Sequence, residues 1–174
     1  MIAMSGVEAF RCSLPTSICI IDMIPGFMKK ATDALINDHK MIRKLLDRFH
    51  PDQPRFPEIA STLKRVVLSH AWFEDQVFLP AFKTIPLMNN RYVQELTAEH
   101  KDIDYFMQLI HQTQPSRELE IHVKQFRAIL ENHLQKEEDA LFPLAESLLN
   151  KEGMNNLSAE MERRQHEAQK LFNS

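Results

Sequence analysis

Two stretches of the chain decide its fold because they repeat one pattern. Residues 70–80 read HAWFEDQVFLP, and residues 133–143 read HLQKEEDALFP. In both, a glutamate follows the histidine by four residues and a proline follows it by ten. Residues four apart lie on the same face of an α-helix, so each stretch predicts a helix that presents a histidine and a glutamate together.

Each of these stretches is preceded by one member of a second pair of matching segments. Residues 38–42 read DHKMI, and residues 99–103 read EHKDI. His39 precedes His70 by 31 residues, and His100 precedes His133 by 33, so equivalent positions keep almost the same separation. The pattern therefore predicts two copies of one helix pair, related by an approximate two-fold axis.

Apolar residues recur in steps of three and four around each of these histidines, which is typical of helices with one buried face. The pattern predicts helices that begin near Ala31 and near Pro57, a third from Asn90 to Gln112, and a fourth from Ser116 to Leu149. The connections are short, which favours antiparallel neighbours. We therefore expect an all-α fold, an up-down-up-down four-helix bundle with a short fifth helix at the C-terminus.

The bundle is expected to occupy residues 29–150. Residues 1–28, interrupted by Pro15 and Pro25, are expected to form an irregular extension. Gly153 is expected to break the chain before a short, polar helical tail within residues 151–174. Cys12 and Cys19 lie in the extension at a wider spacing than zinc or redox pairs normally have, so we assign them no role.

The composition excludes several classes of protein. Only three glycines in 174 residues favour helices over a turn-rich β fold. A net charge of −3 gives no general attraction to nucleic acid or to an anionic membrane. The sequence has no apolar run of about eighteen residues and no basic residue before Arg11, so we expect neither a transmembrane helix nor a secretory signal. We expect a cytoplasmic protein, monomeric or homodimeric, that binds neither nucleic acid nor a membrane.

Each of the four predicted helices carries a histidine in its apolar face, and two of them add a glutamate one turn later. One such histidine, or one such pair, is more often structural. Four histidines and two glutamates in repeated positions indicate more than a structural role. Two buried carboxylates are costly unless something neutralises them, and a pair of cations does so. The predicted metal ligands are His39, His70, Glu74, His100, His133 and Glu137.

The kind of donor limits which metal these residues can hold. Six nitrogen and oxygen donors are too many for one tetrahedral zinc ion. Two ions of higher coordination number, bridged by carboxylates, match the set better. Iron is the first choice and manganese the second.

With these residues, the chain over residues 31–149 resembles the hemerythrin family and the hemerythrin-like HHE cation-binding domains. The resemblance implies four terminal histidine ligands, at positions 39, 70, 100 and 133. It also implies that Glu74 and Glu137 bridge two iron ions in an oxo- and carboxylate-bridged di-iron centre.

The sequence departs from the oxygen-carrying hemerythrins in two places. Those carriers have two histidines one turn apart on the third helix, whereas Leu96 and Asp104 stand one turn on either side of His100 here. They also have an aspartate five residues after the fourth-helix histidine, where this chain has Glu138. Asp104 is either a ligand or a residue at the rim of the site. Glu137 is preferred as the bridge, with Glu138 as its rival.

The four-histidine, two-glutamate set resembles most closely the di-iron proteins of iron–sulfur repair and nitric oxide stress. Those proteins often carry an N-terminal domain with adjacent cysteines, which residues 1–28 are too short to form. Glu99, next to His100, either supplies protons or iron to the site or is an ordinary surface residue.

We therefore expect a non-haem di-iron protein that binds or reacts with oxygen, nitric oxide or peroxide, in redox or nitrosative stress response or in iron donation. The alternative is an iron or oxygen sensor or interaction module, in which metal binding stabilises the bundle without turnover. Whether the protein is an enzyme stays open.

Four further histidines lie outside this set. His50 and His111 end the first and third predicted helices, and His122 opens the fourth. They could form a minor surface site, but solvated helix ends are the simpler interpretation. His166, on the polar tail, is assigned no role.

Overall fold

The computed structural model describes residues 30–82 and 90–172. The predicted irregular extension, with its two cysteines, lies outside the described residues. Within them all regular structure is helical, which confirms the all-α prediction. The elements are α1 (Ala31–Leu46), α2 (Phe56–Phe73), η1 (Glu74–Phe78), η2 (Leu79–Phe82), α3 (Asn90–Gln112), α4 (Arg117–Lys136), η3 (Glu137–Leu141), α5 (Phe142–Leu148) and α6 (Lys151–Phe172).

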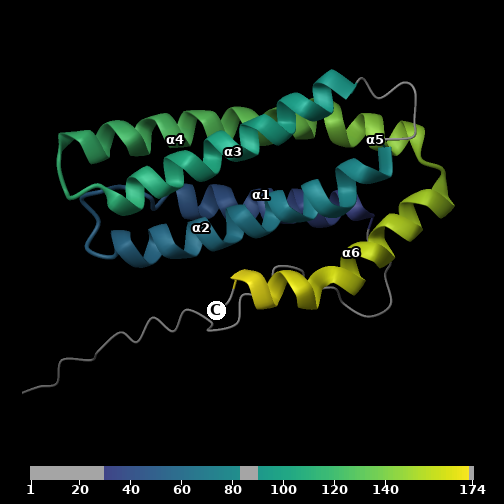
Figure 1. Cartoon of the computed structure of the whole chain (residues 1–174), viewed down its shortest axis with the longest axis horizontal. Helices are drawn as coiled ribbons and strands as arrows, with labels where there is room; N and C mark the ends of the chain where they lie inside the picture. The colour runs from purple at the N-terminus through teal and green to yellow at the C-terminus, as the bar shows by residue number, and fades with distance from the viewer. Residues whose placement is uncertain (1–29, 83–89, 173–174) are drawn as a thin grey trace, which may run out of the picture.

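The helices form the predicted four-helix bundle. Helix α1 packs against α2 and α3 packs against α4, while α2 contacts α3 and α1 contacts α4. Figure 1 shows the two pairs as two layers, with the fourth helix continued by η3 and α5. The two sequence repeats thus become two neighbouring helix pairs.

Local sequence explains where the helices begin. Pro57 stands in the first turn of α2, where a missing N–H costs nothing. The Ser116 hydroxyl caps α4 by accepting a hydrogen bond from the backbone N–H of Leu119 at 3.3 Å. Glu118 and Glu120 then place negative charge in the first turn, where the helix dipole favours it.

The second and fourth helices each change pitch at a glutamate, which the sequence did not predict. The π-helical turn η1 starts at Glu74, whose carbonyl accepts a hydrogen bond from the N–H of Leu79, five residues on. The turn η3 starts at Glu137, whose carbonyl accepts from the N–H of Phe142. A proline follows each glutamate by six residues and has no N–H to give to the carbonyl four residues before it. The wider turn accommodates this gap, and such turns are frequent at functional sites.

The C-terminal helix differs from the prediction. Helix α6 begins at Lys151 and runs for 22 residues, so it is not short, and Gly153 lies inside it rather than breaking the chain. The Asn150 side chain caps it by accepting a hydrogen bond from the Gly153 N–H at 2.8 Å. Met154, Leu157 and Met161 are buried, and α6 lies along α1 and α2 (Figure 1).

The core consists of two apolar clusters with a polar layer between them. Along α1, Leu35 belongs to the first cluster and Ile42 to the second, with His39 between them. Along the fourth helix, Leu130 belongs to the second cluster and Leu141 to the first. Buried polar side chains of all four bundle helices occupy the layer between, which is therefore the place to look for a site.

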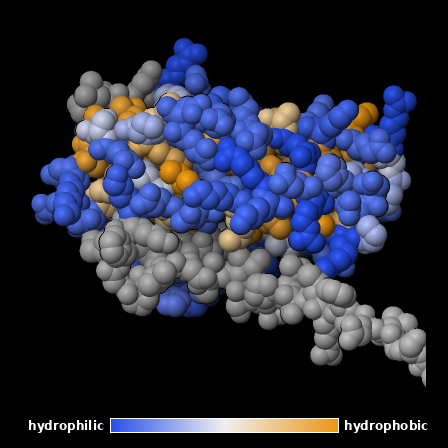
Figure 2. All heavy atoms as spheres, turned by 180° about the vertical axis from the view of Figure 1, so that it is seen from behind, coloured by the Kyte–Doolittle hydropathy of each residue, from blue (hydrophilic) through white to orange (hydrophobic). Residues whose placement is uncertain are grey.

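The outer face is mainly polar. Figure 2 shows hydrophilic side chains over most of the coloured part of one face, with smaller hydrophobic areas between them. Across residues 30–82 and 90–172, no helix combines the length and apolar character needed to cross a membrane.

Candidate metal centre

The structure brings all six predicted ligand residues together in the polar layer. Their exposed fractions run from 0% to 6%, so water does not satisfy their polar atoms. The six residues are His39 of α1, His70 of α2, Glu74 of η1, His100 of α3, His133 of α4 and Glu137 of η3. Their convergence supports the predicted site, while their identity as metal ligands stays a prediction.

The six residues divide into two groups of four that share both glutamates. His39 and His70 form one group with Glu74 and Glu137, and His100 and His133 form the other with the same two glutamates. Within each group, one donor atom of every residue lies within 4.8 Å of the others. This is the arrangement that two cations bridged by two carboxylates require.

The ring nitrogens of each histidine pair face one another. Nε2 of His39 lies 3.1 Å from Nε2 of His70, and Nε2 of His100 lies 3.1 Å from Nε2 of His133. Two nitrogens that each lie about 2.1 Å from one ion at a right angle are about 3.0 Å apart. The spacing within each pair therefore suits two ligands of a single ion.

The glutamate oxygens lie between the two pairs. Oε2 of Glu137 is 3.3 Å from Nε2 of His39, while its Oε1 is 3.1 Å from Nε2 of His133. Oε2 of Glu74 is 3.2 Å from Nε2 of His100 and 3.5 Å from Nε2 of His70. Each carboxylate thus reaches both histidine pairs.

None of the four glutamate oxygens has a hydrogen-bond partner among the described residues, although all four are buried. An unpartnered buried carboxylate is strongly unfavourable, and native proteins normally satisfy or neutralise such groups. Two cations among these oxygens and nitrogens would supply the missing partners. The donor set therefore fits a pair of metal ions.

A carboxylate lies beside the outer nitrogen, Nδ1, of each histidine. Oε1 of Glu138 is 2.7 Å from Nδ1 of His39, and Oε2 of Glu99 is 2.8 Å from Nδ1 of His133. In the same way, Asp75 Oδ1 is 3.0 Å from Nδ1 of His100, and Asp38 Oδ2 is 3.6 Å from Nδ1 of His70. A carboxylate that accepts the Nδ1 proton leaves the Nε2 lone pair for a metal ion.

These four carboxylates follow the internal two-fold symmetry. In each copy of the repeat, the residue before the first histidine lies beside Nδ1 of the second histidine. Asp38 lies in this way beside His70, and Glu99 beside His133. The residue after each central glutamate lies beside a histidine of another helix, Asp75 beside His100 and Glu138 beside His39. His39, His100 and His133 are therefore each held by a hydrogen bond from a helix other than their own, whereas Asp38 lies beside His70 Nδ1 beyond hydrogen-bond distance.

The charges at the centre move several pKa values away from their usual range. Burial lowers the pKa of His100, but Asp75 and Glu74 more than offset this and raise it to about 10. The pKa values of His70 and His133 are likewise raised, because neighbouring carboxylates outweigh burial. Burial raises the pKa of Glu137, but His133 and the other imidazoles overcome it and hold that pKa well below its usual range.

Without a cation, these shifts mean that protons balance the buried carboxylates. Metal ions need the same nitrogens unprotonated, so metal binding here would release protons from the centre. The outer carboxylates behave differently. Burial raises the pKa values of Glu99 and Glu138, but Lys136 and Arg43, with the bonded histidines, lower both below their usual range. They are ionised acceptors.

The structure shows where the residues lie whose role at the site the sequence left open. Glu138 is bonded to His39 Nδ1, whereas Glu137 lies between the two histidine pairs, so the geometry favours Glu137 as the predicted bridge. Asp104 is half-buried and accepts a hydrogen bond from Gln108 at 2.8 Å, away from the centre. Leu96 is buried in the first apolar cluster and has no donor atom. Glu99 is hydrogen-bonded to His133 of α4, so it is not an ordinary surface residue.

The remaining histidines stand apart from the centre. His50, His111 and His166 are exposed, as expected for helix ends and the polar tail. His122 is half-buried, and its Nδ1 lies 3.3 Å from the Thr113 hydroxyl. None of them belongs to either candidate metal group.

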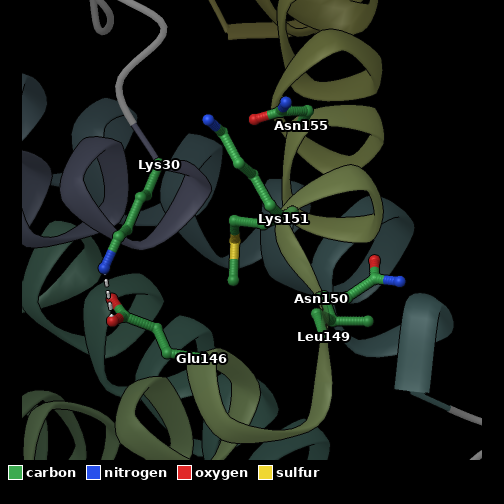
Figure 3. A pocket seen from close by; sticks show the side chains of 7 residues that line it. Lys30, Glu146, Leu149, Asn150, Lys151 and Asn155 are labelled. Carbon is green, nitrogen blue, oxygen red and sulfur yellow. Dashed lines mark hydrogen bonds and ion pairs between the residues drawn. The ribbon is translucent and has the colours of Figure 1, made fainter.

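Two surface cavities lie away from the six residues. One, of about 400 Å³, lies where α1 begins and α5 is followed by α6, and Figure 3 shows the ion pair there between Lys30 and Glu146, 2.7 Å apart. The other, of about 490 Å³, lies between α1 and α4 and is lined in part by Arg43. Neither is lined by any of the six residues, so neither gives a bulky molecule access to the centre.

Sequence reasoning missed two residues of this arrangement, Asp38 and Asp75. The available signal was their position within the repeated motifs, since an acidic residue precedes His39 and His100 and another follows Glu74 and Glu137. Read as one repeat, those four acidic residues form a set. Their partners could not be identified without the rotation of each helix about its axis.

Comparisons with known proteins agree with this geometry. The family model described as the hemerythrin HHE cation-binding domain matches residues 30–145, and matches again over residues 91–174. The second match starts in α3, as the internal repeat would lead one to expect. A search of curated proteins found no match.

One solved structure has the same fold. It is the crystal structure of a hemerythrin HHE cation-binding domain-containing protein from Mycobacterium kansasii, with a TM-score of 0.70 and 18% sequence identity. The likeness covers 80% of this chain and 87% of that one. Because the family model spans well over half of the sequence, the chain belongs to the hemerythrin family of HHE cation-binding domains.

Proposed function

We propose that the protein holds two iron ions at the centre and that a small molecule, such as oxygen, nitric oxide or peroxide, binds or reacts there. The observation that carries the proposal is the set of four unpartnered oxygens of Glu74 and Glu137 between two histidine pairs. Family membership supports metal-cation binding, and the donor set favours iron over zinc.

The number of donors supports a reactive centre. Each group offers two histidine nitrogens and two shared carboxylates, which makes four protein ligands for an ion that accepts five or six. No fifth histidine is available on α3, where Leu96 and Asp104 stand one turn on either side of His100, and neither belongs to a candidate metal group. Open coordination positions are what a metal site needs in order to bind an external ligand.

The surroundings favour a small ligand. All six residues are nearly inaccessible to water, and the Phe142 ring lies 5.3 Å from the His39 ring. Diatomic molecules and peroxide are small enough to enter through side-chain motion, whereas a larger substrate would need an open cleft. Iron in this setting would supply redox chemistry, while the surrounding carboxylates would hold the imidazoles in position.

The experiment is metal analysis and absorption spectroscopy of protein purified without oxygen. We expect about two irons per chain and a spectrum that changes on addition of air, nitric oxide or peroxide. His133→Ala should lower the iron content and the spectral response, whereas His166→Ala, at an exposed position on α6, should change neither. Folded protein that takes up no iron under these conditions would contradict the proposal.

A further inference from the structure

We propose that Glu138 and Glu99 are positioning residues, each of which fixes one ligand histidine so that its Nε2 lone pair points to the metal, and that each governs a different ion. The proposal rests on the proposed function, because it assigns the histidines as ligands. It goes further by naming which outer residue controls which half of the centre.

The first chain of contacts begins at the surface of α1. The Nη1 atom of Arg43 donates to Oε1 of Glu138 at 2.6 Å, and the same oxygen lies 2.7 Å from Nδ1 of His39. Nε of Arg43 also donates to Glu131 at 2.8 Å, which fixes the guanidinium from a second side. The carboxylate of Glu138 is thus held between a cation and an imidazole.

The second chain has the same design with different residues. Oε2 of Glu99 lies 2.8 Å from Nδ1 of His133, while its Oε1 accepts a hydrogen bond from the ammonium group of Lys136. Here the carboxylate comes from α3, and the cation and the histidine come from α4. In the first chain the carboxylate comes from η3, and the cation and the histidine come from α1.

This recurrence argues for a function rather than chance packing. Arg43 follows His39 by four residues, and Lys136 follows His133 by three, so each cation stands one turn from its histidine. Glu138 and Glu99 occupy different places in their motifs, one after a bridging glutamate and one before a histidine. Two unlike sequence solutions therefore produce the same kind of contact chain at His39 and at His133, two positions that the internal repeat does not relate to each other.

The contact has a direct chemical consequence. A carboxylate can only accept hydrogen bonds, so the Nδ1 atom that faces it must carry the proton. In a neutral imidazole the other nitrogen, Nε2, then has the free lone pair. Without the carboxylate, the imidazole can rotate or place its single proton on Nε2, where it blocks the metal. Loss of such outer partners typically weakens metal binding by about 10- to 100-fold.

The two chains of contacts hold histidines that belong to different ions. His39 belongs to the group with His70, and His133 belongs to the group with His100. Loss of Glu138 should therefore weaken the binding of one ion, and loss of Glu99 the binding of the other. A general loss of fold stability would instead weaken the binding of both ions together.

The first measurement is a Co²⁺ titration of the metal-free, full-length chain, followed by absorption. In Glu138→Ala and in Glu99→Ala we expect one of the two Co²⁺ ions to bind about 10- to 100-fold more weakly and the other to bind as in the wild type. Glu138→Gln and Glu99→Gln should restore most of the affinity, because an amide oxygen still accepts the Nδ1 proton. Asp139→Ala and Asp102→Ala, at exposed neighbouring positions, should leave both ions unchanged.

The second measurement needs no metal. Nδ1 protons bonded to carboxylates are protected from exchange and should give low-field proton resonances for His39 and His133 by NMR. We expect Glu138→Ala to remove the first resonance alone and Glu99→Ala the second alone. Unchanged resonances and unchanged Co²⁺ affinities would overturn the positioning proposal while leaving the metal centre intact. If each variant lost only its own histidine resonance but the protein bound no metal, the contacts would be upheld and the proposed function refuted.

Discussion

Glu137 places its two carboxylate oxygens on opposite sides of the centre, with Oε2 3.3 Å from His39 and Oε1 3.1 Å from His133. These histidines stand on α1 and α4, in different copies of the repeat. One side chain therefore joins the two halves of the bundle, and Glu74 does the same for His70 and His100. The predictions below follow from this shared position and from what surrounds it.

Metal loading should stabilise the fold, because it neutralises carboxylates that otherwise lack partners. At a free metal concentration 100 times the dissociation constant, one bound ion adds about 2.7 kcal/mol to the free energy of unfolding. Glu74→Gln removes a shared ligand charge and should abolish most of this gain. Thermal unfolding with and without metal measures it, and Glu162→Gln, exposed on α6, is the control. An equal gain in the Glu74 variant would argue against its role.

The metal-free protein should lose stability as the pH rises from 7 to 10. Burial lowers the pKa of His100, but Asp75 and Glu74 raise it overall to about 10, compared with about 6.5 in an unfolded chain. The native state then holds a proton that the unfolded state does not, and this contribution is complete below about pH 6.5 and disappears as the pH passes through 10. Chemical unfolding in the presence of a chelator measures it. His100→Gln should flatten the dependence, and a rise in stability over this range would contradict the shift.

Asp104→Ala should leave metal content and metal affinity unchanged. The Asp104 carboxylate is occupied by the Gln108 amide on the outer part of α3 and takes no part in either metal group. Metal analysis of the variant beside the wild type tests this directly. A fall to one ion per chain would show that the aspartate moves inward when metal binds.

Helix α6 should contribute to stability through its buried face. Met161 is 2% exposed, and replacing such a residue with alanine typically costs about 2–5 kcal/mol. Leu171 is 54% exposed on the same helix, and Leu171→Ala should change the free energy of unfolding by no more than about 0.5 kcal/mol. Denaturant unfolding of both variants gives the comparison. Equal, small effects would mean that α6 is not part of the cooperative fold.

The bundle could be predicted because its signals are local and repeated. The third helix runs from Asn90 to Gln112 as the apolar pattern indicates, and Pro57 marks the start of α2. The six central residues could be found for the same reason, since a histidine in an apolar stripe must face the core. Spacing within one helix carried that information.

What the sequence did not disclose depends on contacts between helices. The π-helical turns at Glu74 and Glu137 arise where a helix must pass a proline and still direct a carboxylate inward, although the shared proline spacing was visible. The contact of Glu138 with His39 joins residues on different helices, so no spacing rule gives it. Gly153 lies inside α6 because the Asn150 cap and the buried face stabilise the helix despite the glycine.

The sharing of Glu74 and Glu137 also has a consequence for how the centre fills. If the proposed pair of ions binds, each histidine would face one ion and each glutamate both, so the first ion to bind would fix half of the ligands of the second. It would also leave the shared carboxylates less negative, which would oppose the entry of a second cation. Binding of the two ions would then be thermodynamically linked, and the sign of their cooperativity would report whether preorganisation or charge dominates in this bundle.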